Sequence, residues 1–330
     1  MVNVFIVNPV AGTIDRTEII QRELGYRSDI QYILFNTEEA GQERSLVKRI
    51  LDIFDDEPVR VFICGGSGTL SNSIDAMEEQ DFDHVEIGYY PCGTTNDFLK
   101  NFGKDRVLFE DINRVIEGEP YYIDFMRCTI NGDRSGNELL FSSVGIPAKI
   151  EEFASGIKPI GVISPGILYT LGAVFSIPFS APVNYEIDVD GVDYSGSYTV
   201  IYTGNSVCLG GGYFPIKKGI DCRDGYANIM LLKKTPMHKY FKYLFGFMHG
   251  TLPETNPDDI VLLRGKKVSV RRTDGKPMVL NSDGELYKAD SYEMEIVPKK
   301  LKFIVPKNCS FETDIDETIK HEHLCKKGKR

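Results

Sequence analysis

The segment Gly65-Gly66-Ser67-Gly68-Thr69 is a glycine-rich loop that directly follows an apolar run and precedes a stretch with helical spacing. Glycines let main-chain N–H groups approach a phosphate closely, and the start of a helix adds partial positive charge there. The loop is therefore typical of a phosphate-binding turn. A tight strand-to-helix connection without a ligand would leave the same pattern, and the loop alone does not separate the two.

A second glycine loop, Gly93-Thr94-Thr95-Asn96, follows the next apolar run along the chain. Its hydroxyl and amide groups can bond to phosphate or ribose, and the carboxylate of Asp97 is a group that can meet a metal such as Mg²⁺. Two such loops at the same edge of a sheet would enclose a nucleotide. Asn96 and Asp97 also suit a helix cap before Phe98, a structural role that is compatible with binding.

Both loops need a sheet whose strands end at one edge. Four runs are short, rich in β-branched or aromatic residues, and bounded by turn residues: Val2–Val7, Ile30–Phe35, Val59–Cys64 and Val85–Tyr90. Helical spacing of apolar residues fills the intervals at Thr17–Leu24, Glu43–Phe54 and Leu70–Glu79. This alternation predicts a doubly wound α/β nucleotide-binding domain over residues 1–124, with its ligand site at the carboxyl ends of the strands.

The pattern changes after residue 124 to many short strand-like runs with turn signals such as Asp190-Gly191 and Asp274-Gly275. It predicts an antiparallel β-sandwich over residues 125–297, with a helical insertion around Leu168–Ile177. Residues 298–330 are predicted to form a strand that returns to the first domain, followed by a basic tail. The apolar stretch Ile157–Ile177 could accept acyl chains or form ordinary core.

The chain has 330 residues and a formal net charge of −10. This charge argues against nucleic acid as a partner, because such binding depends on Lys and Arg that neutralise phosphates. Seven cysteines without a Cys-x-x-Cys pair indicate neither a zinc site nor a disulfide framework and suit a reducing cytoplasm. With no signal or membrane-spanning segment indicated, we expect a cytoplasmic protein. The basic groups Lys217-Lys218 and Lys326–Arg330 could contact anionic head groups or simply be solvated.

Further motifs occur in a fixed order between residues 2 and 305. They are Asn8-Pro9 with Gly12, the two glycine loops, Asp124, Gly204-Asn205 with Gly210-Gly211-Gly212, Asp221 with Asp224-Gly225, and Asp283-Gly284-Glu285. In this order they resemble the catalytic domain of diacylglycerol kinases and related bacterial lipid kinases. The resemblance implies an α/β domain joined to a β-sandwich, a fold of the NAD kinase and diacylglycerol kinase type, with ATP bound between the two.

The resemblance also implies roles for individual residues. Asn8, Gly65, Gly66, Ser67, Gly68, Thr69, Gly93, Thr94, Thr95 and Asn96 would bind ATP. Asp97 and Asp124 would lie near Mg²⁺ and the phosphates, and Glu285 would act as the general base for the acceptor hydroxyl. Asp221, Asp224 and the carbonyl of Tyr226 would hold a second, structural Mg²⁺. Without the resemblance, Glu285 is an ordinary turn acid and residues 221–226 are a turn before a strand.

The main departure from the family pattern is Ser67. The first loop ordinarily reads Gly-Gly-Asp-Gly-Thr, and its acid is thought to reach Mg²⁺ through water. A serine there removes one negative charge and leaves a neutral hydroxyl. Residues 141–148 also lack the usual asparagine and the acid before Ala148. These changes predict that the nucleotide site is retained while the rate of catalysis is reduced.

Three functions remain open on the sequence. The first is an ATP- and Mg²⁺-dependent kinase acting on a lipid hydroxyl such as that of diacylglycerol, peripheral at the inner membrane face. The second is a catalytically weak regulatory protein that binds a nucleotide or a lipid. The third is an NAD kinase, which shares the first glycine motif; the Gly-Thr-Thr-Asn-Asp-Phe loop and Glu285 favour the lipid branch. A homodimer is an open alternative to a monomer.

Overall fold

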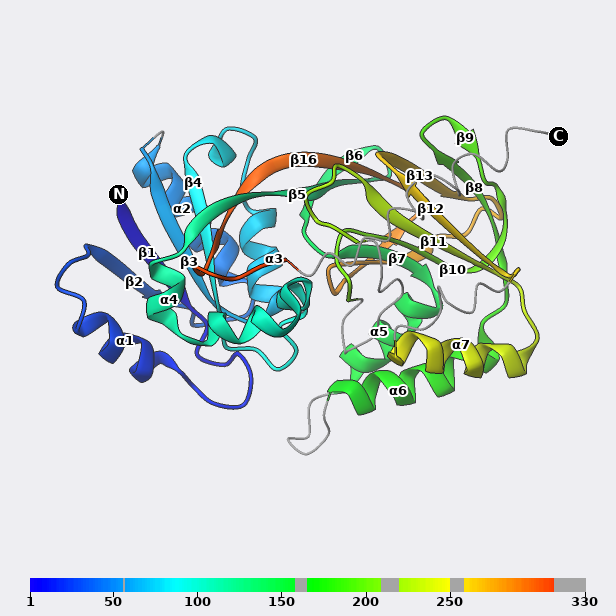
Figure 1. Ribbon diagram of the computed structural model, residues 1–330. Coiled ribbons are helices and arrows are strands. Elements are labelled where there is room, and N and C mark those ends of the chain that lie inside the picture. The colour runs from blue at the N-terminus through cyan, green and yellow to red at the C-terminus, as the bar shows by residue number, and fades with distance from the viewer. Residues whose placement is uncertain (56, 158–164, 209–219, 250–257, 312–330) are drawn as a thin grey trace. The chain divides into compact units, whose positions relative to one another are not determined.

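The computed structural model describes residues 1–55, 57–157, 165–208, 220–249 and 258–311 (Figure 1). The chain divides into two compact units, of which the first contains Met1–Phe125 and Pro298–Glu312 and the second contains Met126–Val297. No helix among the described residues is long and apolar enough to cross a membrane. The motifs at Gly210-Gly211-Gly212, Lys217-Lys218 and Lys326–Arg330 lie outside the described residues.

The first unit is built on a parallel sheet. Its strands lie in the order β2 (Tyr32–Asn36), β1 (Val2–Val7), β3 (Val59–Gly65), β4 (Val85–Pro91) and β16 (Ser291–Val305). Strands β1 and β3 are apolar and almost wholly buried, as strands covered on both faces require. Phe5 and Phe62, on these two strands, stack with their ring centroids 4.7 Å apart. The predicted doubly wound domain is confirmed.

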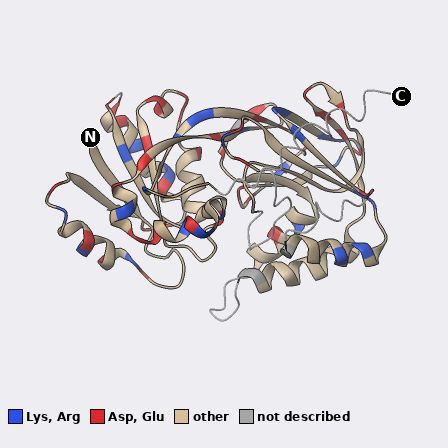
Figure 2. Cartoon of the chain, viewed as in Figure 1, with Lys and Arg blue, Asp and Glu red and all other residues tan. Residues whose placement is uncertain are grey.

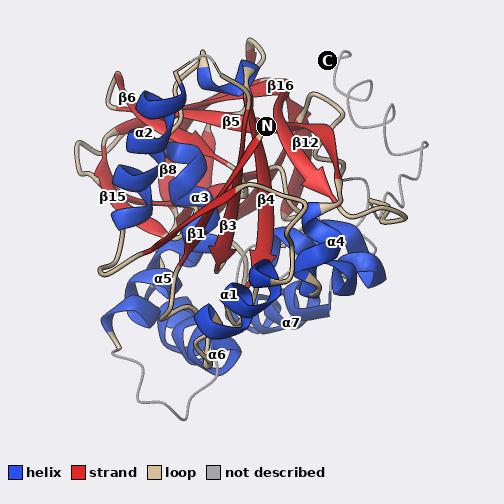
Figure 3. Ribbon diagram, turned by 90° about the vertical axis from the view of Figure 1, so that its left-hand side faces the viewer, coloured by secondary structure: helices blue, strands red, loops and turns tan. Residues whose placement is uncertain are grey.

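Helices cover both faces of this sheet. Figure 3 shows α2 (Gln42–Phe54) and α3 (Ser67–Asp75) on one face and α1 (Thr17–Gly25) and α4 (Ile112–Ile116) on the other. The short helical turn η1 (Asp81–Asp83) precedes β4, and the longer helical segment η2 (Asp97–Glu110), which is interrupted at Gly103, follows it. Helix α3 ends at Asp75 rather than at the expected Glu79, because the chain turns where the Asp81 carboxylate accepts the Glu78 N–H at 2.6 Å. Met77 is buried although it follows the helix. The apolar pattern of the sequence therefore continues past Asp75, and the predicted helix was too long.

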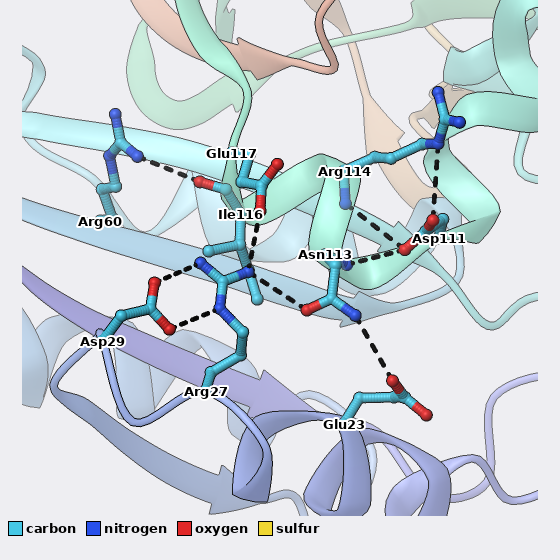
Figure 4. Close-up of polar contacts among 9 residues, drawn as sticks. All are labelled: Glu23, Arg27, Asp29, Arg60, Asp111, Asn113, Arg114, Ile116 and Glu117. Atoms are coloured by element: carbon cyan, nitrogen blue, oxygen red, sulfur yellow. Dashed lines mark hydrogen bonds and ion pairs between the residues drawn. The ribbon is translucent and has the colours of Figure 1, made fainter.

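Arg27 joins the two helices on the second face (Figure 4). Its guanidinium donates to both oxygens of Asp29 at 2.8 Å, to Asn113 at 3.2 Å and to Glu117 at 3.3 Å. Asn113 in turn donates to Glu23 of α1 at 3.4 Å. The Asp29 carboxylate raises the pKa of Arg27, and Arg27 lowers that of Asp29. This network connects α1 and α4 on the face away from α2 and α3.

The second unit is antiparallel throughout. Strand β10 (Gly196–Gly204) pairs with β11 (Ala227–Lys233), and also with β7 (Phe141–Gly145) and β8 (Val183–Val189). Beyond these three strands, β11 pairs with β12 (Ile260–Gly265). Strand β7 pairs with β14 (Met278–Ser282), which pairs in turn with β15 (Glu285–Ala289). Strand β8 pairs with β13 (Lys267–Arg272), which pairs in turn with β16. Two hairpin strands complete it, β6 (Asp133–Glu138) beside β5 (Glu119–Ile130) and β9 (Val192–Asp193) beside β8. The predicted antiparallel domain is confirmed.

The described residues of the second unit form three helices and one helical turn: α5 (Ile146–Gly156), α6 (Pro165–Ser176), η3 (Ile177–Phe179) and α7 (Met237–His249). Helix α6 is the predicted helical insertion, whereas α5 and α7 were not predicted. Pro236 directly precedes α7, and Tyr240, Tyr243 and Phe247 follow at helical spacing, so a signal for this helix was present. Aromatic residues also occur between these positions, so the helical period of the apolar residues was not apparent in the sequence.

Candidate functional site

Three loops of the first unit meet where β1, β3 and β4 end. The N–H of Asn8, after β1, donates to the carbonyl of Cys64 in β3 at 2.9 Å. The N–H of Cys92, after β4, donates to the carbonyl of Gly65 at 2.8 Å. Strand β1 has β2 on one side and β3 on the other, so the chain reverses its winding at this point. Ligands of doubly wound sheets bind at such a reversal.

Glycines allow the three loops to touch. A Cβ on Gly12, whose φ is +77°, would lie 2.2 Å from the carbonyl oxygen of Cys92, and a Cβ on Gly93 would lie 2.5 Å from the Cα of Gly66. Neither position can carry a side chain without moving the backbone. Gly66 differs, because its Cβ would lie 3.5 Å from Gly93, an ordinary contact. A Cβ at Gly68 would meet no atom within 4 Å, so the first loop keeps open space at the start of α3.

Side-chain amides hold the loops in place. Asn8 Nδ2 donates to Thr69 Oγ1 at 3.0 Å, which links the loop after β1 to α3. Asn96 Nδ2 donates to the carbonyl of Gly93, and Asn96 Oδ1 accepts from the hydroxyl of Tyr89, both at 2.8 Å. Asn96 has φ 44° and makes no side-chain cap, so its expected capping role is replaced by bracing of the second loop. Asparagine is one of the few residues that adopts this conformation readily.

Ser67 connects the two glycine loops. Its Oγ accepts the main-chain N–H of Asp97 at 2.8 Å. It is also hydrogen-bonded to Tyr89; burial raises the pKa of that phenol well above its ordinary value, and the bond to Ser67 opposes the rise. The carboxylate of Asp97 is almost fully buried and forms an ion pair with Lys100. The structure therefore brings Ser67 and Asp97 together and gives Asp97 a cationic partner that the sequence did not indicate.

Asp124 lies in β5 and is fully buried. Its Oδ1 accepts the main-chain N–H of Lys299 at 2.7 Å, at a residue with φ +51°. Asp124 thus stabilises the bend in β16 at the point where this strand enters the first unit. Its predicted place near a metal ion stays a prediction.

In the second unit, Asp283 and Gly284 form a two-residue hairpin turn between β14 and β15. Their φ angles of 46° and +95° are those of a turn type that favours Asp-Gly. The Asp283 carboxylate accepts the N–H groups of Leu139, Leu140 and Phe141 at 2.7, 2.9 and 2.8 Å. Asp283 therefore anchors the turn to the start of β7, and Glu285 follows directly as the first residue of β15.

Glu285 is partly exposed, and its Oε2 accepts the hydroxyl of Tyr287 at 2.6 Å. The Gly284 N–H donates to Asn281 Oδ1 at 2.9 Å, which fixes the other side of the turn. A carboxylate fixed on a rigid hairpin and partly open to solvent can take a proton from a hydroxyl that reaches it.

A buried acid that the sequence did not indicate lies behind this turn. Glu138 accepts the hydroxyl of Ser142 at 2.9 and 3.0 Å and that of Ser282 as well. Burial, together with the negative charge of Asp283, raises the pKa of Glu138 to about 8. Ser282 immediately precedes Asp283, so the protonation of Glu138 bears directly on the turn that presents Glu285. A lone Glu before an apolar strand carries no sequence signal of such burial.

The residues predicted to hold a structural Mg²⁺ are bound by arginines. Asp221 pairs with Arg223 at 2.9 Å, and Asp224 pairs with Arg264. The Arg264 guanidinium lies 5.0 Å from the ring centre of Tyr226. Burial raises the pKa of Asp224 to about 6, against the opposing effect of Arg264. Among the described residues, no group of three or more His, Cys, Asp or Glu could hold a metal. A metal at Asp224 would have to displace Arg264, and this site stays a prediction.

An apolar pocket of about 60 Å³ lies between α5, α6, α7 and the sheet of the second unit. Its lining includes Ile150, Ala173, Ile177, Leu232, Phe247 and Asn281. Asn281 thus both borders the pocket and holds the Gly284 N–H beside Glu285. Part of the predicted acyl-binding stretch, residues 165–177, supplies one wall, and residues 158–164 lie outside the described ranges.

Comparison with known proteins assigns each unit to a known domain. Residues 3–128 match the diacylglycerol kinase catalytic domain, and residues 142–305 match the YegS C-terminal NAD kinase beta sandwich-like domain. The chain is 24% identical over 314 residues to the "Probable lipid kinase YegS-like" of Shewanella frigidimarina, covering 90% of each chain. It is 25% identical over 234 residues to the diacylglycerol kinase of Bacillus subtilis, covering 68% of this chain and 70% of that one.

A solved structure shares the fold. The crystal structure of a diacylglycerol kinase from Bacillus anthracis superposes with a TM-score of 0.66 at 18% identity, covering 93% of this chain and 98% of that one. The two domain matches follow one another in the order that the sequence motifs predicted. The chain belongs to the diacylglycerol kinase family of lipid kinases, with a catalytic domain followed by a YegS-type β-sandwich domain.

Proposed function

We propose that the protein phosphorylates the hydroxyl group of diacylglycerol or a related lipid, with ATP as the donor and Mg²⁺ as the required ion. The observation that carries the proposal is the position of Asn281, which borders the apolar pocket and also holds the turn before Glu285. An acyl chain in the pocket would therefore bring its own hydroxyl towards Glu285. Because the pocket wall is almost wholly apolar, it suits a lipid better than NAD as acceptor.

ATP is proposed to bind at the three loops of the first unit. Open space at Gly68, in the first turn of α3, fits phosphate groups held by main-chain N–H donors. Thr94, Thr95 and Asn8 would add hydroxyl and amide contacts. Asp97 and Asp124 would hold Mg²⁺, which neutralises charge on the transferring phosphoryl group when bound. At Asp97 the ion would compete with Lys100.

Glu285 is proposed as the general base. It takes the proton of the acceptor hydroxyl as that oxygen bonds to the γ-phosphorus, while the bond to the bridging oxygen of ADP breaks. Tyr287 orients the carboxylate through its 2.6 Å hydrogen bond. Such a reaction places the protein in the cytoplasm at the inner face of the membrane, where its lipid acceptor lies.

A second function is favoured by the chemistry at Ser67. A neutral hydroxyl stands where the family has an acid, and the neighbouring Asp97 is already paired with Lys100. Both features weaken the attraction for a metal ion while leaving the glycine loops intact. The same scaffold would then bind a nucleotide or a lipid and serve as a regulatory protein with little turnover.

One experiment separates these functions. The purified protein is incubated with radiolabelled ATP, Mg²⁺ and either dioctanoylglycerol or NAD, and ATP binding is measured in parallel by calorimetry. Labelled phosphatidic acid as the product confirms the lipid kinase, whereas labelled NADP as the product would identify an NAD kinase instead. ATP binding without product on either acceptor supports the regulatory function. Absence of ATP binding contradicts the kinase and a nucleotide-binding regulatory protein, and leaves only the lipid-binding form of the regulatory function.

A further inference from the structure

The helices of the second unit expose large apolar side chains in rows. In α6 and η3 the large apolar residues that are exposed at this spacing are Ile167 (54% of the residue's surface accessible), Leu171 (40%), Phe175 (55%) and Phe179 (81%). They recur at every fourth position, so they lie on one face of the helical segment. Val174, beside them, is also exposed. A helix that packs only against its own domain would carry polar groups on such a face.

Helix α7 repeats this arrangement. Met237, Phe241 and Phe245 follow one another at every fourth position and are 44%, 45% and 64% exposed. Together with Ile167, Leu171, Val174, Phe175 and Phe179 they form what we call the docking face. Exposed apolar groups concentrated on two neighbouring helices mark an interaction site rather than the scattered apolar residues of an ordinary surface.

The inner faces of the same two segments line the apolar pocket. Ala173 and Ile177 contribute from the first segment, and Tyr243 and Phe247 contribute from α7. One set of helices therefore separates the pocket from the docking face. A lipid that enters the pocket does so beside exposed apolar groups on the helices that enclose it.

The charge of this region suits an anionic partner. Neither α6 nor α7 contains an acidic residue, although the chain as a whole has a net charge of −10. Figure 2 shows α6 without charged residues and basic residues on α7. Lys233, Lys234 and Lys242 are exposed on or just before α7, and Lys149 of α5 lies 3.4 Å from the carbonyl oxygen of Phe179. Asp259, which borders α7, is held by Lys239 and Tyr243.

We propose that the docking face binds the surface of an anionic phospholipid bilayer, with α6 and α7 lying in the plane of the interface. The phenylalanines enter the boundary between head groups and acyl chains, and the four lysines contact anionic head groups. The pocket then takes the acyl chain of the acceptor directly from the bilayer. This inference rests on the proposed lipid kinase function, which it extends by naming the surface through which the acceptor is reached.

Vesicle flotation tests the surface without requiring turnover. The full chain is mixed with vesicles of phosphatidylcholine containing phosphatidylglycerol. Phe179→Ser and Phe245→Ser are each expected to weaken binding by roughly tenfold, as the loss of a buried aromatic side chain implies. Tyr26→Ser, which removes a 76% exposed aromatic residue from the first unit, is the matched control and should bind as the wild type does. Lys233→Glu with Lys234→Glu should also weaken binding, and Lys48→Glu should not.

The outcomes separate this inference from the kinase function. Wild-type protein that does not float, or variants that float as well as the wild type, would overturn the docking face whatever the enzyme assay gives. Variants that lose self-association in sedimentation while still binding vesicles would assign the face to a dimer interface and overturn it too. If vesicle binding falls as expected and no lipid is phosphorylated, the docking face stands and the kinase function fails. The ratio of turnover on vesicles to turnover on dioctanoylglycerol in detergent micelles should fall in the docking variants.

Phe179→Ser keeps the test interpretable, because a residue that is 81% exposed contributes little to the fold. Its thermal unfolding midpoint should match that of the wild type. Loss of vesicle binding at an unchanged midpoint then assigns the effect to the surface itself.

Discussion

The Oγ atom of Ser67 accepts the main-chain N–H of Asp97 at 2.8 Å, so the residue that we expect to replace the family's acid also joins the two glycine loops. A serine hydroxyl satisfies this donor without adding charge, whereas a carboxylate at the same place could accept the same bond and also attract a cation. Lys100 already supplies a cation at Asp97. The local geometry therefore accommodates the neutral residue, and the loops stay assembled without the acid.

Gly66 and Gly93 are expected to respond differently to a single methyl group. Gly66→Ala fits the fold, since its Cβ meets Gly93 at 3.5 Å, but it narrows the space beside the loop N–H donors. We expect an unchanged thermal midpoint and ATP binding weakened by roughly tenfold, about 1.4 kcal/mol. Gly93→Ala places its Cβ 2.5 Å from Gly66 and should lower both the midpoint and ATP affinity. Calorimetry beside thermal unfolding measures both, and normal ATP affinity in Gly66→Ala would remove the first loop from the site.

Glu285→Gln should reduce the rate of lipid phosphorylation by roughly 10² or more, as expected for loss of a general base, while ATP affinity is unchanged. Tyr287→Phe removes the hydrogen bond that orients the carboxylate and should cause a smaller loss. Glu295→Gln, at an exposed position of β16, is the matched control. Steady-state turnover and ATP calorimetry provide the two measurements. A parallel loss of ATP affinity would show that Glu285 supports the fold of the turn instead.

Much of the first unit could be predicted from the sequence because its strands are buried on both faces. Such strands appear as continuous apolar runs, and the expected bounds of β1 agree with the structure. Strand β2 begins at Tyr32 rather than Ile30, because Ile30 lies in a turn closed on the carbonyl of Arg27. Glycine loops were equally visible, since tight approach of the backbone requires glycine itself.

Contacts between distant residues could not be predicted. Glu138 is bonded to Ser282, which lies 144 positions further along the chain, and Asp224 to Arg264, which lies 40 positions further. No local pattern records such a partner. In α7, apolar residues occur on both the buried and the exposed face, so its period was hidden. The exposed apolar groups that conceal the helix are the ones from which we infer membrane docking.

Glu138 should make stability depend on pH. Its pKa is about 8 in the folded chain and 4.5 ordinarily, so between these values the folded protein binds a proton that the unfolded chain lacks. The stabilising contribution is complete below about pH 4.5 and is lost as pH rises to about 8. It amounts to roughly 5 kcal/mol at most, because each unit of pKa shift corresponds to about 1.4 kcal/mol. Asp283, Cys128 and Tyr292 face this carboxyl group and share its environment.

Glu138→Gln keeps a neutral group of similar shape and should remove this dependence. Unfolding in denaturant from pH 5 to pH 8 measures the free energy of the wild type and the variant. We expect the variant to gain stability relative to the wild type as pH rises, with Glu152→Gln, at an exposed position of α5, as the control. If the difference in free energy of unfolding between the variant and the wild type is constant from pH 5 to pH 8, Glu138 ionises normally.

Asp224→Ala is expected to lower the thermal midpoint even in EDTA, because it leaves the Arg264 guanidinium unpaired in a partly buried position. The loss should be of the order of 1–3 kcal/mol. Repeating the measurement with Mg²⁺ tests the predicted metal site. Stabilisation by Mg²⁺ that disappears in the variant would establish the metal, since an ion bound only by the folded state stabilises it by mass action. An equal midpoint for variant and wild type in EDTA would mean that the ion pair contributes nothing.

Ser67→Asp is expected to raise the rate of lipid phosphorylation, or to create it where the wild type shows none, without a comparable change in affinity for ATP alone. The new carboxylate would stand at the start of α3, where negative charge is favourable, and could still accept the Asp97 N–H. Its charge would draw Mg²⁺ towards the transferring phosphoryl group, where placement of the ion affects the transition state. Ser67→Asn, equal in size and neutral, is the matched control and should not raise the rate. Turnover at saturating Mg²⁺ and ATP affinity are measured for each variant. If ATP binding weakens and turnover does not rise, the carboxylate repels the triphosphate and no metal lies within its reach.

A wild-type rate of roughly 1–100 per second, typical of efficient kinases, would show that Ser67 is a tolerated replacement and that the neutral loop does not limit catalysis.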